Sequence, residues 1–118
     1  MSVTIYGIKN CNTMKKAFDW LDDHKVTYDF HNYKTDGISP EKLDTWLKQE
    51  KPEILVNNKG TTFRNFTDEQ KANYKTAETA KEMMLENQSV IKRPVIEKDG
   101  RIVAVGFDEE RYKGLFGI

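Results

Sequence analysis

Cys11 is the residue whose chemistry stands out in this sequence, because it is the one cysteine among 118 residues. A single thiol allows no intrachain disulfide, and it excludes a zinc site built from several thiolates. The charged residues before Asp19 are all lysines, namely Lys9, Lys15 and Lys16, so the charge around the thiol is positive. A cationic neighbourhood lowers the pKa of a cysteine. We interpret Cys11 as a reactive thiolate, with an inert buried cysteine as the alternative.

Polar side chains flank this thiol on both sides. Asn10, Asn12 and Thr13 are its neighbours, and Lys9 lies two residues before it. A cysteine that only fills a hydrophobic core would more often have apolar neighbours. We therefore predict that Lys9, Asn10, Asn12 and Thr13 help to bind a substrate or an anion beside Cys11.

The dipeptide Arg93–Pro94 is a second candidate for chemistry. A proline is tolerated at the start of a strand, and in the topology predicted below it faces the Cys11 turn. A cis bond there would hold the backbone beside the thiol in a shape that a trans peptide does not adopt. The guanidinium of Arg93 can present a planar fork of donors to an anion. The alternative is that Arg93 is a solvated surface charge.

The elements that position Cys11 can be predicted from hydrophobic patterns. Residues 3–8 are nearly all apolar and β-branched, which predicts a buried strand. Apolar residues from Met14 to Leu21 recur with the spacing of an amphipathic helix. Residues 26–31 alternate between apolar and polar, which predicts a second strand. Cys11 therefore lies where a strand becomes a helix, inside a right-handed βαβ unit.

The rest of the chain carries local start and turn signals. Ser39–Pro40 predicts a helix start, and Thr67 with Gln70 has the spacing of a capping box. A further helix is expected over residues 77–87. Asp99–Gly100 predicts a two-residue turn between two strands, and Asp108 can cap a last helix. The order βαβ, helices, ββα predicts an α/β thioredoxin-like fold with a mixed sheet and a helical insertion. We expect a single domain over residues 1–118.

Composition and charge narrow the class of protein. Lysine and arginine number 19, as do aspartate and glutamate, so the formal net charge is zero and direct nucleic-acid binding is not expected. No apolar stretch reaches the length of a membrane span or of a signal-peptide core, so we predict no membrane association and a cytoplasmic protein. The two histidines have no partners at metal-ligand spacing, and no bound metal is predicted.

Three motifs together resemble the arsenate reductase-like family, which includes ArsC, Spx and YffB, and they match the YffB branch best. They are the segment 6–11 followed by a Lys-Lys-Ala helix, the segment 60–64, and Arg93–Pro94–Val95. The resemblance implies a thioredoxin-like fold and glutathione-linked reduction of a thiol or an oxyanion. It implies that Cys11 is the nucleophile, that Arg64 and Arg93 bind the anion, and that Pro94 is cis.

Three functions follow from these residues as alternatives. The leading one is a glutathione-dependent monothiol reductase in which an external thiol, with glutaredoxin as a further partner, releases the mixed disulfide at Cys11. The second is arsenate reduction, although residues 102–107 contain no arginine to match the third arginine of the arsenate reductases. The third is a non-catalytic regulator that binds RNA polymerase, as the resemblance to Spx implies. Spx often carries a Cys-x-x-Cys pair, whereas Met14 occupies the second cysteine position here.

Overall fold

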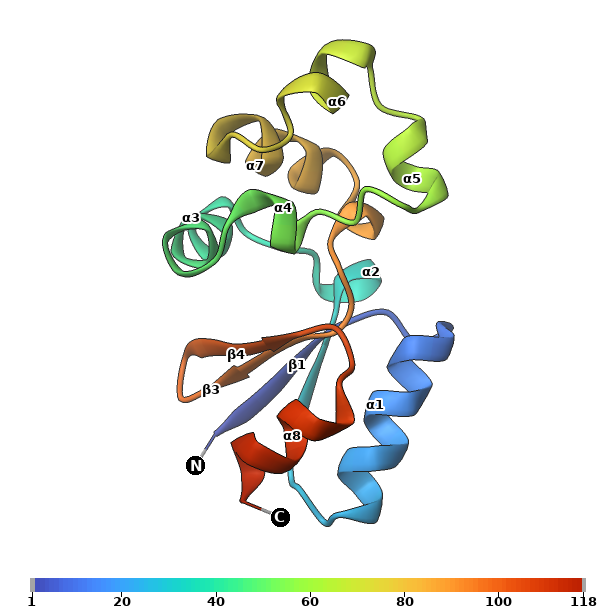
Figure 1. The fold of residues 1–118 in the computed structure, drawn as a ribbon, viewed down its shortest axis with the longest axis vertical. Helices are drawn as coiled ribbons and strands as arrows, with labels where there is room; N and C mark the ends of the chain where they lie inside the picture. The colour runs from blue at the N-terminus through green and yellow to red at the C-terminus, as the bar shows by residue number, and fades with distance from the viewer. Residues whose placement is uncertain (1, 118) are drawn as a thin grey trace. The chain divides into compact units, whose positions relative to one another are not determined.

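A computed structural model describes residues 2–117 of the chain. These residues form two compact units, one made by the chain up to Asn32 and from Arg93 onward, and one made by Tyr33–Lys92. The first unit contains a four-stranded sheet with the strand order β2-β1-β3-β4 (Figure 1). The predicted α/β thioredoxin-like class, with its mixed sheet, is confirmed.

The first unit opens with the predicted βαβ arrangement. Strand β1 (Val3–Gly7) leads through a short loop into helix α1 (Asn12–Asp23), and β2 (Asp29–Asn32) returns parallel to β1. The prediction that the second strand begins at Val26 was wrong by three residues. Lys25 has a φ of 58°, and the N–H of Val26 donates to the carbonyl of Leu21 at 2.9 Å, so this segment closes the end of α1 before pairing with β1 begins.

The hairpin after Arg93 completes the sheet. Strand β3 (Val95–Lys98) runs antiparallel to β1, and β4 (Arg101–Val105) runs antiparallel to β3. Asp99 and Gly100 join them with φ values of 54° and 84°, the two positive values that a type I′ turn requires. The predicted hairpin is therefore confirmed. Helix α8 (Glu109–Phe116) follows, and its N-cap Asp108 accepts from the N–H of Arg111 at 3.2 Å.

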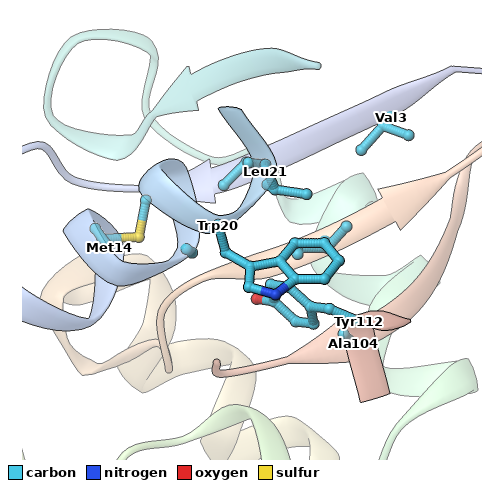
Figure 2. Packing of buried hydrophobic residues seen from close by; sticks show 9 residues of the cluster. Val3, Met14, Trp20, Leu21, Ala104 and Tyr112 are labelled. Carbon is cyan, nitrogen blue, oxygen red and sulfur yellow. The ribbon is translucent and has the colours of Figure 1, made fainter. Parts of the chain in front are cut away.

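A hydrophobic core lies between the sheet and the two helices α1 and α8, which lie on the same side of it (Figure 1). Trp20 of α1 and Tyr112 of α8 meet edge to face with ring centroids 5.4 Å apart (Figure 2). Burial of such large side chains is the main stabilising contribution to a domain of this size. The buried members of the core are Val3, Ile5, Met14, Ala17, Trp20, Leu21, Ile96, Ala104 and Tyr112.

The second unit is helical. Its elements are α2 (Tyr33–Asp36), α3 (Pro40–Gln49), α4 (Pro52–Leu55), α5 (Thr61–Arg64), α6 (Asp68–Asn73), α7 (Ala77–Glu86) and the short helix η1 (Gln88–Val90). Helix α7 packs against α3, α6 and η1. The predicted caps are present, since Ser39 accepts from the N–H of Lys42 and Thr67 forms a reciprocal capping box with Gln70. Over residues 2–117, no helix combines the length and the apolar character that crossing a membrane would need.

Candidate functional site

Cys11 is the N-cap residue of α1, with the extended backbone that this position adopts. Its carbonyl accepts the first bond of the helix, from the N–H of Lys15 at 3.0 Å, and its own N–H donates to the carbonyl of Lys9 at 3.1 Å. The side chain is partly exposed. The sulfur therefore lies at the positive end of a helix of 12 residues and is accessible to solvent.

The surroundings of the thiol favour its ionised form. Burial raises the pKa of Cys11, but this effect is outweighed by hydrogen bonding from the backbone N–H groups of Met14 and Thr13 and by the positive charge and hydrogen bonding of Arg93. The net result is a pKa below the ordinary value of a cysteine thiol. A larger thiolate fraction near neutral pH makes the sulfur a better nucleophile.

Arg93 reaches this thiol from the far end of the sequence. It is half-buried, and it immediately precedes β3, the strand that pairs with β1. The Arg93–Pro94 peptide bond is cis, and the carbonyl of Pro94 accepts from the N–H of Gly106 at 2.7 Å. The sheet thus brings together Cys11 and Arg93, two side chains that are separated by most of the chain.

The other predicted site residues near the thiol form two groups. One residue acts through its backbone, and three present exposed side chains. Thr13 is half-buried, and its backbone N–H at the start of α1 contributes to the lowered pKa of Cys11. Lys9, Asn10 and Asn12 are exposed and line a groove beside Cys11. At the end of the groove nearest the sulfur, a negatively charged molecule would meet the cation of Lys9 and the amides of Asn10 and Asn12.

Residues 6–115 match the sequence profile of the ArsC family. The chain belongs to the ArsC family. A curated protein of Haemophilus influenzae with no assigned activity is 42% identical over 114 residues, which cover 97% of this chain and 98% of that protein. The global transcriptional regulator Spx of Streptococcus agalactiae is 24% identical over 115 residues, 96% of this chain and 82% of Spx.

Solved structures of ArsC relatives share the fold. A protein named YffB superposes with a TM-score of 0.89 at 47% identity, covering 96% of this chain and 97% of YffB. An arsenate reductase related protein from Brucella melitensis has a TM-score of 0.78 at 49% identity, covering 100% of this chain and 97% of that one. The predicted resemblance to the ArsC, Spx and YffB family is confirmed.

Arg64, the remaining predicted anion-binding residue of this ArsC protein, lies in the helical unit. It is the last residue of α5, its side chain is exposed, and its carbonyl accepts from Nζ of Lys71 at 3.3 Å. Its participation in the site of Cys11 stays a prediction. In the described part of the chain, no three histidine, cysteine, aspartate or glutamate side chains gather to hold a metal ion.

Three further residues of the groove, one and two turns into α1, were not predicted from the sequence. Lys15, Phe18 and Asp19 line the same groove as Cys11. Helical spacing could have indicated them, because positions four and seven residues apart share a face of a helix. The groove beside Cys11 therefore extends along the exposed surface of α1.

Proposed function

We propose that this protein is a glutathione-dependent monothiol reductase of the cytoplasm, with Cys11 as its nucleophile. One observation supports the proposal above the rest, namely a partly exposed thiol whose pKa is lowered by a helix start and by Arg93. A thiolate attacks disulfides more readily than a thiol does. ArsC family membership is in accord with this chemistry.

The proposed reaction has two exchange steps. The Cys11 thiolate attacks a sulfur of a mixed disulfide between a substrate and glutathione, a bond forms between Cys11 and glutathione, and the substrate leaves as a thiolate. A second glutathione thiolate then attacks the glutathione sulfur of that intermediate. Glutathione disulfide forms and the Cys11 thiolate leaves. The substrate has been reduced to a thiolate, and the two glutathione molecules end as glutathione disulfide. Because the chain has one cysteine, the second thiol must come from outside.

Arginines have a binding role in this proposal. Arg93 stabilises the Cys11 thiolate and would bind a carboxylate of glutathione with its planar fork of donors. We propose Arg64 as a second carboxylate-binding side chain. Replacement of Arg64 with Met should then raise the KM for glutathione, and an unchanged KM would remove Arg64 from the site.

The test uses the mixed disulfide of glutathione and β-mercaptoethanol, with glutathione as the reductant. Wild-type protein should catalyse release of β-mercaptoethanol, and Cys11→Ser should lose this activity entirely. Circular dichroism of both proteins shows whether the fold is intact. Equal turnover by the two proteins, or no turnover by a folded wild type, would contradict the proposal.

Two alternative functions, arsenate reduction and binding to RNA polymerase, can be tested in the same way. The arsenate reductase related structure favours a test of arsenate with glutathione and glutaredoxin, in which we expect little turnover because residues 102–107 contain no arginine. The relationship to Spx favours a test for a regulator that binds RNA polymerase. Polymerase captured equally by wild type and Cys11→Ser would support a non-catalytic role.

A further inference from the structure

The groove beside Cys11 is large enough to hold part of a small peptide. Its volume is about 490 Å³, within the range of roughly 300 to 1,000 Å³ of small-molecule sites. The thiol lies at the start of α1, and the groove follows the helix through its second turn. Its lining residues are Lys9, Asn10, Cys11, Asn12, Lys15, Phe18 and Asp19.

A pair of opposite charges lies along this groove. Nζ of Lys15 is 2.7 Å from Oδ2 of Asp19, and these side chains are 75% and 59% exposed. With a rise of about 1.5 Å per residue, the two positions lie roughly 6 Å and 12 Å along the helix from Cys11. An exposed ion pair contributes little net stability, so a ligand that carries both charges can replace its two internal contacts with contacts of its own.

Phe18 gives the groove an apolar wall between Cys11 and Asp19. Its ring is half-buried, stacks on Tyr28 with centroids 5.7 Å apart, and meets Phe30 edge to face at 5.1 Å. Contacts on two sides hold the ring in place. The groove therefore offers a nucleophilic sulfur and, farther along α1, an apolar ring beside a cation and an anion.

One end of glutathione carries chemical groups that match this set. Beyond its thiol, the γ-glutamyl residue has an amide and two methylenes, and then a carbon that carries both an ammonium and a carboxylate. We propose that the groove binds the γ-glutamyl end of the glutathione joined to Cys11, with its carboxylate on Lys15 and its ammonium on Asp19. This inference rests on the proposed reductase function and assigns Lys15 and Asp19 as residues that determine its specificity.

The first exchange step can be measured by itself. Reaction of Cys11 with glutathione disulfide gives a Cys11–glutathione disulfide and one glutathione thiolate, and mass spectrometry follows the adduct. Bis(hydroxyethyl) disulfide is the reference, because it undergoes the same exchange without a γ-glutamyl end. Lys15→Ala and Asp19→Ala should each lower, by about fivefold, the ratio of the rate with glutathione disulfide to the rate with the reference disulfide.

Matched controls separate groove contacts from net charge. Lys16→Ala and Asp23→Ala make the same charge changes at exposed positions of α1 outside the groove lining, and they should retain the wild-type preference for glutathione disulfide. An equal loss in the controls, or no loss in Lys15→Ala and Asp19→Ala, would overturn the groove assignment while the reductase proposal stands. A wild-type Cys11 that forms no glutathione adduct would instead overturn the reductase proposal.

Discussion

A Cβ atom built on Gly7 would overlap the Sδ atom of Met14. Met14 is fully buried and follows Cys11 by three residues in the first turn of α1. The bare backbone of Gly7 therefore allows the start of α1 to approach the end of β1 closely. Since the backbone N–H of Met14 also stabilises the Cys11 thiolate, this close approach is part of the architecture of the site.

Gly7→Ala should destabilise the protein, because the new methyl group and the Met14 side chain cannot share the same space. We expect a loss of about 1–3 kcal/mol in the free energy of unfolding, measured by urea denaturation. Met14→Ala alone should cost about 2–5 kcal/mol, because it opens a cavity. The double variant should lose about 0.5–3 kcal/mol less than the sum of the single losses.

Gly114→Ala is the matched control for this cycle. Gly114 lies in α8, and a Cβ atom there would have no atom within 4 Å. The substitution should leave stability unchanged or raise it by up to about 1 kcal/mol. Strict additivity of Gly7→Ala and Met14→Ala would contradict the steric account.

Arg93→Met should slow alkylation of Cys11 several-fold near neutral pH. Arg93 lowers the pKa of the thiol, so its removal raises that pKa and leaves less thiolate at a given pH. The difference should vanish at alkaline pH, where both proteins are fully ionised. The measurement is the iodoacetamide alkylation rate as a function of pH.

Arg101→Met is the control for charge, because Arg101 is exposed on β4. Its alkylation profile should match that of wild type. Superimposable profiles for wild type and Arg93→Met would show that Arg93 does not act on the thiol.

The free energy of unfolding should fall as pH rises above about 10. Burial raises the pKa of Tyr6 and of Tyr112, and burial together with Asp22 raises the pKa of Tyr28 to about 12. A raised folded-state pKa gives stability that is complete below the unfolded-state pKa of about 10 and is lost as pH rises toward the folded-state value. Urea denaturation at increasing pH measures the decline, which should be shallower in Tyr28→Phe. A flat profile over this range would contradict the prediction.

Tyr6→Phe should destabilise the protein by about 1–3 kcal/mol at neutral pH, because it removes a buried hydrogen bond to a carboxyl group. The hydroxyl of Tyr6 on β1 donates to Oε1 of Glu97 on β3 at 2.8 Å, and Glu97 is only 4% exposed. Thermal or urea unfolding measures the loss. Tyr74→Phe removes an exposed hydroxyl contact with Asn58 and should cost much less.

Local chemistry accounts for what could be predicted from the sequence. The capping box at Thr67 and the turn at Asp99–Gly100 depend on neighbouring residues alone, so both were predicted correctly. The four-residue helices α2, α4 and α5 are too short to show a hydrophobic period and were not predicted individually. The strand expected over residues 26–31 forms only from Asp29, because the hydrogen bond from Val26 to Leu21 of α1 directs the backbone before it.

In the candidate site, too, the features set by local sequence were predicted, and those set by tertiary packing were not. Cys11 at a helix start followed from the change of hydrophobic period between a strand and a helix. The contact of Gly7 with Met14, and the groove that reaches Asp19, depend on how β1 and α1 pack in three dimensions. Local residue patterns carry little information about such packing, so the extent of the groove could be determined only from the structure.

Met14 limits the disulfides that Cys11 can form on oxidation. A buried thioether occupies the position where a second cysteine would close an internal disulfide. A disulfide at Cys11 must therefore add a foreign thiol or a second copy of the chain. Each oxidised chain would carry one thiol from its surroundings in a mixed disulfide with Cys11. The mass of that adduct would identify the thiol.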